Sequence, residues 1–149
     1  MILICASFSL SYALTSTGAV KSMAHFLLLT FENKYILLLI VELIVILLGC
    51  FLDGTPIIVL LAPIASTILI PIGIHPLHLA AVFVFTSVLA MVTPPVGIVL
   101  YAASAVVGVS VGDMLKEIWL FFLPTLVVLL IITFFPAIVL FLPKILGMI

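Results

Sequence analysis

The sequence predicts an all-α integral membrane protein, and two observations support that prediction. Hydrophobic residues make up 68% of the 149 positions and charged residues 6%, with a mean hydropathy of +1.73. A soluble domain carries about 25% charged residues, so this chain has too few to cover a surface that faces water. The apolar residues form continuous runs and do not alternate as barrel strands do, so helices are expected to cross the bilayer.

The first segment, residues 1–34, is predicted to contain one membrane helix and an interfacial stretch. Residues 2–20 are moderately apolar, and no cationic region precedes them, which favours a membrane helix over a signal peptide. The polar stretch from Lys21 to Lys34 is predicted to be a short helix at the membrane surface that ends near Asn33.

The second segment, residues 35–110, begins with two apolar runs, 35–52 and 57–72, on either side of the turn signal Asp53–Pro56. Each run is slightly shorter than the roughly 20 residues that cross a bilayer. The runs fit either two membrane spans or one re-entrant hairpin whose tip stops inside the protein. Pro63 and Pro71 are predicted to interrupt the second arm and favour the hairpin.

A broken helix is predicted in the rest of this segment. Residues 77–109 contain no charge, and one continuous helix of that length would measure about 50 Å against a core of roughly 30 Å. The sequence Thr93-Pro94-Pro95-Val96-Gly97 marks the break. The two prolines remove two backbone donors, and Gly97 permits an unusual backbone angle.

The third segment, residues 111–149, is predicted to contain an interfacial helix followed by a last membrane span. Asp113 to Glu117 are charged and Trp119 follows them, as is common at a water–lipid boundary. The span is expected over about residues 120–142, with Lys144 beyond its end. Four lysines and no arginine leave the orientation undefined.

The two interruptions, residues 49–56 and 90–97, are the candidate functional site. Unwound backbone at membrane depth occurs where it is buried in protein or lines a cavity, and its carbonyls form ion sites in secondary transporters. If the interruptions meet, carbonyls and the hydroxyls of Thr55 and Thr93 suit a monovalent cation such as sodium. Helix N-termini after them favour an anionic substrate. The alternative is a packing kink at the prolines and a turn-forming Asp53.

Other residues admit two interpretations or point away from chemistry. Glu42 lies in an apolar run and is either functional or a neutral acid bonded to a neighbouring helix. His75 is predicted to be interfacial, and His78 a residue of the helix start, with a functional role as the alternative. Cys5 and Cys50 are interpreted as small buried hydrophobes. Neither a catalytic pair, a metal-ligand spacing nor a basic face is present, so no enzyme, cofactor or nucleic acid is expected.

The ordered motifs resemble the C-terminal half of the large membrane subunit, DctM-like, of TRAP transporters, the tripartite ATP-independent periplasmic transporters of bacteria and archaea. The motifs that carry the resemblance are Glu32–Tyr35, Leu47–Asp53, Pro63, Gly73–His78, Val92–Gly97, Ala103-Ser104, Gly108–Ser110, Phe135-Pro136 and Leu142-Pro143. The resemblance covers essentially the whole chain and corresponds to the second of two inverted repeats.

The resemblance implies one repeat of an elevator-type transporter in the inner membrane, as a multi-pass protein. It implies sodium-coupled import of small organic acids such as C4-dicarboxylates or sialic acid. A periplasmic binding protein would deliver the substrate, and a small membrane subunit would accompany the permease.

The resemblance also implies the residues of the site. The sodium ligands would be carbonyls at Gly49, Ala90 and Val96 together with the Thr93 group. The candidates for the hairpin tip or the substrate site are Asp53, Gly54, Thr55, Pro94, Pro95 and Gly97.

The chain departs from the family pattern in three respects. Ala90 stands where the family usually has glycine, and His75 where it usually has aspartate. The family's subunit is several hundred residues long, so this chain is either part of a permease or a truncated or split protein that retains only the second repeat and does not transport.

Overall fold

The computed structural model describes Ser9, Tyr12, Ala13, residues 16–18, 33–51, 53–94 and 97–147. Most of the first predicted span, residues 2–20, and residues 21–32 of the predicted interfacial stretch lie outside the described residues. The described part is helical and contains no strand, which confirms the all-α prediction. Its main helices are α3 (Lys34–Gly49), α4 (Gly54–Leu69), α5 (Pro76–Ala90), α6 (Ile98–Val107), α7 (Val111–Phe134) and α8 (Pro136–Ile145).

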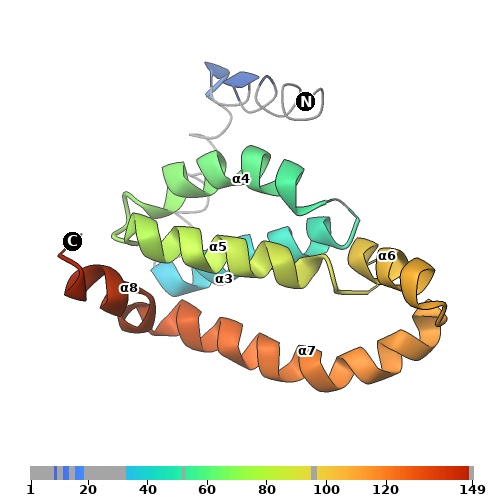
Figure 1. The fold of residues 1–149 in the computed structure, drawn as a ribbon. Coiled ribbons are helices and arrows are strands. Elements are labelled where there is room, and N and C mark those ends of the chain that lie inside the picture. The colour runs from blue at the N-terminus through green and yellow to red at the C-terminus, as the bar shows by residue number, and fades with distance from the viewer. Residues whose placement is uncertain are drawn as a thin grey trace.

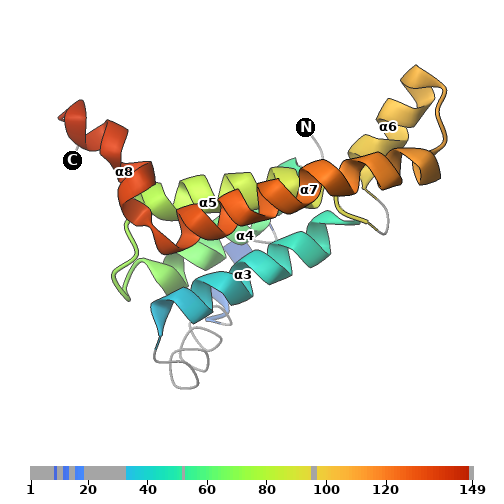
Figure 2. The ribbon, with the colours of Figure 1, turned by 90° about the horizontal axis from the view of Figure 1, so that it is seen from below.

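Helix α5 is the centre of the arrangement. It packs against α3 and α4 on one side and against α7 and α8 on the other (Figure 1). Seen from below, α3 and α7 both run alongside α5 (Figure 2). Fully buried side chains such as Leu38, Val82 and Leu129 come from these three helices and form one core. The core therefore holds the hairpin, the first half of the broken helix and the last long helix together.

Helices α3 and α4 form the predicted hairpin. Asn33 caps the start of α3 by accepting the Tyr35 N–H, and Asp53 caps α4 by accepting the Gly54 N–H at 2.7 Å. The prediction that Pro63 interrupts the second arm is wrong, because α4 continues through it. Pro63 is exposed, and its carbonyl accepts the hydroxyls of Ser66 and Thr67, each at 2.8 Å. That the hairpin is re-entrant stays a prediction.

The predicted broken helix is confirmed. Helix α5 begins at Pro76 behind His75, whose Nδ1 accepts the Leu77 N–H, and it ends at Ala90. Helix α6 begins at Ile98, behind Gly97, so seven residues separate the two helices. The φ angle of Gly97 is +57°, in the left-handed region that glycine adopts without strain.

The prediction for the last segment was wrong in its boundaries. Helix α7 begins at Val111, so the charged patch belongs to its first two turns. Ser110 caps this start, because its Oγ accepts the Asp113 N–H and lies 2.7 Å from the Asp113 carboxylate. The helix ends at Phe134 since Pro136 has no N–H to continue it, and α8 begins there in a new direction.

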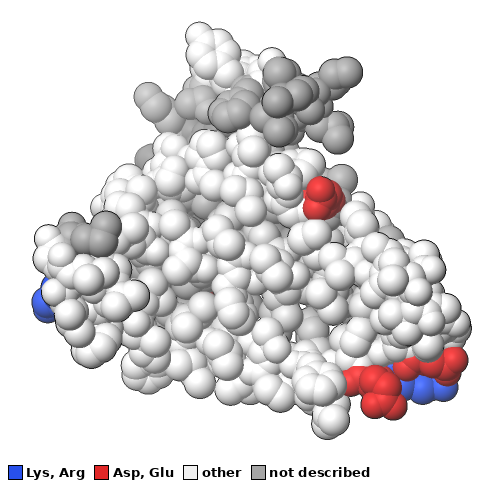
Figure 3. All heavy atoms as spheres, viewed as in Figure 1, with Lys and Arg blue, Asp and Glu red and all other residues white. Residues whose placement is uncertain are grey.

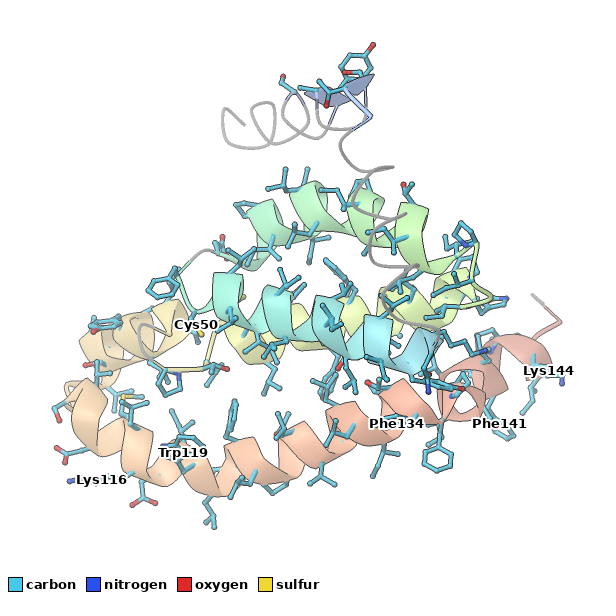
Figure 4. The ribbon with its side chains drawn as sticks, turned by 180° about the vertical axis from the view of Figure 1, so that it is seen from behind. Cys50, Lys116, Trp119, Phe134, Phe141 and Lys144 are labelled. Atoms are coloured by element: carbon cyan, nitrogen blue, oxygen red, sulfur yellow. The ribbon has the colours of Figure 1, made fainter. Side chains whose placement is uncertain are left out.

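Helix α7 is, among the described residues, the one helix long and apolar enough to cross a membrane by length and composition. Large apolar side chains such as Leu120, Phe121 and Val127 are exposed along it. Charged atoms lie only at the margins of the face shown in Figure 3. Lys116 and Trp119 lie at one end of α7, and Lys144 lies on α8 at the opposite end (Figure 4). This distribution suits a lipid environment with water at both ends.

Candidate functional site

The hairpin tip lies against the helix break, and we call residues 49–55 and 90–97 together the tip–break junction. A Cβ built on Gly49 would overlap the Cβ of Ala90 and lie 3.5 Å from its Cα. A Cβ on Gly54 would lie 2.9 Å from the Sδ of Met91. The Cys50 thiol donates to the Pro94 carbonyl at 3.4 Å, and Figure 4 shows Cys50 beside the chain that leads into α6. The predicted meeting of the two interruptions is therefore present.

The break reorganises the backbone hydrogen bonds at the end of α5. Pro94 and Pro95 have no N–H for the carbonyls of Ala90 and Met91, four residues earlier. The Ala90 carbonyl accepts the Thr93 N–H at 3.1 Å instead, and the Met91 carbonyl accepts the N–H of Val99 at 3.4 Å. A carbonyl oxygen has two lone pairs, so each of these turn bonds leaves one for a further partner.

The Thr93 hydroxyl donates to the Leu89 carbonyl at 2.8 Å. Its proton is thereby directed away from the break, and the lone pairs of its oxygen are left for an acceptor role or for a cation. The side chain is half-buried, as are the other described residues of the break from Met91 to Pro94.

The structure brings together three of the four predicted sodium ligands. Gly49 and Ala90 are in direct contact, and Thr93 is joined to Ala90 by the backbone bond within the turn. Val96 lies outside the described residues.

The tip candidates are placed differently. Pro94 accepts the Cys50 thiol, whereas Pro95 lies outside the described residues. Gly54 is buried against Met91, and Thr55 is exposed in the first turn of α4. Asp53 is exposed and engaged as an N-cap, which accounts for it as a turn former.

Two helices begin at the junction. Helix α4 starts behind Asp53, and α6 starts behind the buried Gly97 without a side-chain cap. A helix N-terminus presents unpaired N–H groups and a partial positive charge. Both starts therefore favour negative charge near the site.

A second polar cluster, which we call the α7 clamp, holds the last turn of α7. Its polar contacts come from Glu42 on α3 and His78 on α5. Glu42 is 4% exposed, and its Oε1 lies 2.8 Å from the Thr133 hydroxyl. His78 is 2% exposed, and its Nε2 lies 2.8 Å from the Ile132 carbonyl oxygen.

The chain itself explains why His78 is needed there. In a continuous helix the Ile132 carbonyl would accept the N–H of residue 136, which is a proline without one. His78 supplies the missing donor through Nε2, which fixes the tautomer with that nitrogen protonated. Interpreting His78 only as a residue of the helix start missed this contact, although Pro136 already marked a carbonyl that lacks its helical donor.

Comparison with known proteins settles the family. Residues 1–138 match the family described as the tripartite ATP-independent periplasmic transporter, DctM component. The chain belongs to this family. It is 32% identical over 148 residues to the C4-dicarboxylate TRAP transporter large permease protein DctM of Pseudomonas aeruginosa, covering 99% of this chain and 35% of the relative. It is 27% identical over 124 residues to the sialic acid TRAP transporter large permease protein SiaM of Vibrio cholerae, covering 83% of this chain and 29% of the relative.

A third relative, an uncharacterized protein YgiK of Salmonella typhimurium, is 32% identical over 143 residues, which cover 96% of this chain and 33% of that protein. This chain thus spans about a third of the length of the curated relatives it matches. The family is that of a membrane subunit of TRAP transporters, and the described part of this chain is helical, as expected for such a protein.

Proposed function

We propose that this chain forms the sodium-binding half of the substrate site in a TRAP-type large permease that imports small carboxylates. The observation that carries this proposal is the contact of the hairpin tip with the helix break, where Gly49 touches Ala90. Uncharged oxygens would bind the ion, from the carbonyls of Gly49, Ala90 and Val96 and from Thr93.

The chemistry of the junction supports a monovalent cation. The Ala90 carbonyl and the Thr93 hydroxyl each keep a lone pair after their internal bonds. Gly49 belongs to the last turn of α3, where helix carbonyls lack partners within the helix. The Asp53 carboxylate accepts its own N-cap bond, so the proposed ligand set carries no formal charge. Neutral oxygens with this arrangement suit sodium better than a divalent ion, which prefers carboxylates.

The substrate we propose is a small carboxylate. The names of two relatives specify C4-dicarboxylate and sialic acid, both of which carry carboxylates. The starts of α4 and α6 at the junction would stabilise such an anion. We propose the small TRAP membrane subunit and a periplasmic binding protein as partners. One relative is named as a joined permease protein, DctMQ.

The experiment on the ion site replaces Thr93 with valine, which keeps the shape and removes the oxygen. The host is the Pseudomonas aeruginosa relative with its matching segment exchanged for this chain. We expect the half-saturating sodium concentration for uptake to rise about tenfold, which corresponds to about 1.4 kcal/mol. Folding should be retained because the Leu89 carbonyl still accepts the Val92 N–H.

Thr67→Val is the matched control. Its hydroxyl makes a similar bond to a backbone carbonyl, that of Pro63, but it lies in the last turn of α4 on the exposed surface. The sodium dependence should not change in this variant. If Thr93→Val and wild type had the same half-saturating sodium concentration, Thr93 would not be a sodium ligand. The break would then be explained as a packing kink.

The alternative function, a membrane protein that retains one repeat and does not transport, is addressed by the chain itself. We expect the purified chain in liposomes with a sodium gradient to take up no dicarboxylate or sialic acid above empty vesicles. One repeat offers one hairpin and one broken helix, whereas the transporter mechanism needs a second set. Sodium-dependent uptake by the chain alone would contradict this expectation. Uptake by the exchanged relative would show that the segment is competent in a permease.

A further inference from the structure

We propose that Glu42 is a proton-binding site, whose neutral carboxylic acid donates to the Thr133 hydroxyl and joins the first hairpin arm to α7. This inference does not depend on the sodium site. Glu42 lies in the middle of α3, away from the junction at the end of that helix. Among the described residues, Glu42 is the one acidic residue that is buried, since Asp53, Asp113 and Glu117 are exposed.

The number of protons in the contact supports the neutral acid. The Thr133 oxygen lies 2.8 Å from Glu42 Oε1 and 2.7 Å from the Leu129 carbonyl oxygen. A hydroxyl carries one proton, and a carboxylate and a carbonyl are both acceptors. If Thr133 donates to Leu129, as threonines in helices often do, the bond to Glu42 needs a proton on the carboxyl. Both short distances are then satisfied at once.

Among the described residues, the surroundings of Glu42 offer no positive charge to balance a carboxylate. Apolar side chains of α3 and α5 line the gap beside Glu42, among them Leu38, Val45 and Phe83, and the gap has no room for a water molecule. The hydroxyl of Thr86, which also lines the gap, donates to its own helix at the Val82 carbonyl. An isolated charge in such a place is costly, so the group takes a proton instead.

No cation from a neighbouring helix reaches the carboxyl within the described residues. Helix α4 and the part of α7 that follows Glu117 contain no ionisable residue. On α5, His78 directs Nε2 to the Ile132 carbonyl. On α3, the Lys34 ammonium lies over the Tyr35 ring, and on α8, Lys144 is exposed. The described ion pair is that of Lys116 with Asp113, at the far end of α7.

The contact of α3 with α7 at Glu42 depends on whether the carboxyl group carries its proton. With the proton bound, the two helices share a hydrogen bond in a dry place. If α3 moves away from α7, water reaches the carboxyl and accepts the proton. The fraction of Glu42 side chains that carry a proton therefore depends on whether α3, the first arm of the hairpin, is in contact with α7.

Infrared spectra of the purified full chain in deuterated buffer test this proposal. The spectrum of wild type minus that of Glu42→Gln at neutral pH should show the carbonyl stretch of a protonated carboxylic acid. If the substitution Glu42→Gln removed carboxylate bands from the spectrum and no carboxylic acid band, the proposal would be overturned. Glu117→Gln, at an exposed position, is the control and should remove carboxylate bands.

A second variant keeps the carboxyl in place, so the test does not depend on the folding of Glu42→Gln. In Thr133→Val the acid loses its hydrogen-bond partner, and its carbonyl stretch should move to higher frequency. An unmoved band would overturn the bond between the two side chains.

Unfolding temperatures complete the test. The folded state holds the acid form, whereas an unfolded glutamate releases its proton above pH about 4.3, so wild type should lose stability as the pH rises from that value towards neutrality, and Glu42→Gln should lose less. Equal losses in the two proteins would contradict a bound proton.

Discussion

Gly49→Ala is expected to destabilise the protein by about 1–3 kcal/mol, the usual cost of overpacking a close contact. The added Cβ would overlap the Cβ of Ala90, and it would lie 3.4 Å from Ile57 Cδ1. The Ala90 atoms belong to α5 near its backbone and cannot rotate away, so α3 and α5 must separate at the junction. Thermal unfolding of the purified chain in detergent, followed by circular dichroism, measures the loss.

The reverse exchange makes the prediction specific. Ala90→Gly removes the opposing Cβ, so Gly49→Ala combined with Ala90→Gly should recover most of the loss, with a coupling energy of about 1–3 kcal/mol between the two positions. The contact also explains why both positions hold small residues, because Gly49 leaves the space that the methyl group of Ala90 occupies.

Gly112→Ala is the matched control. Gly112 is exposed in the first turn of α7, and a Cβ there would meet only the Ser110 Oγ, at 3.9 Å. Alanine favours a helix over glycine by about 1 kcal/mol, so this variant should be neutral or slightly more stable. If Gly49→Ala behaved like Gly112→Ala, the hairpin tip could not lie as close to the break as described.

His78→Leu is expected to cost about 1–3 kcal/mol, because it leaves the carbonyl of the half-buried Ile132 without a donor. The Nε2 of His78 lies 2.8 Å from that oxygen and substitutes for the N–H that Pro136 lacks. Leucine retains most of the apolar volume, so the lost donor dominates. The same unfolding measurement in detergent quantifies the effect.

Pro136→Ala tests whether His78 stabilises the protein by donating to the Ile132 carbonyl. An alanine there restores an N–H that can bond to the Ile132 carbonyl, so the cost of His78→Leu should shrink in that background. His75→Leu is the control, because His75 is half-buried and only caps the start of α5. Its cost should stay near or below 1 kcal/mol. A cost of His78→Leu that is the same with and without Pro136 would show that the histidine acts by packing alone.

Much of the candidate site follows from local chemistry that the sequence displays. Asp53 and Gly54 mark the hairpin turn, and Pro94, Pro95 and Gly97 mark the break, because each residue type limits its own backbone wherever the chain goes. The cap at Ser110 is a local signal of the same kind, yet the predicted start of the last span, about residue 120, lies nine residues beyond the start of α7 at Val111. The charged side chains of its first turns suggested a separate surface helix, whereas exposed charges are compatible with a continuous helix.

The amino-acid sequence is enough to predict a helical membrane chain with a hairpin, a broken helix and the motifs of the TRAP large permease. Composition, continuous apolar runs and proline positions are enough for that, since they act through the solvent and through local backbone geometry. Three contacts emerge only in the folded chain: Gly49 packs against Ala90, His78 donates to the Ile132 carbonyl, and Glu42 is hydrogen-bonded to Thr133. Those contacts join residues 41, 54 and 91 positions apart, and their partners depend on how α3, α5 and α7 pack, which no local pattern specifies.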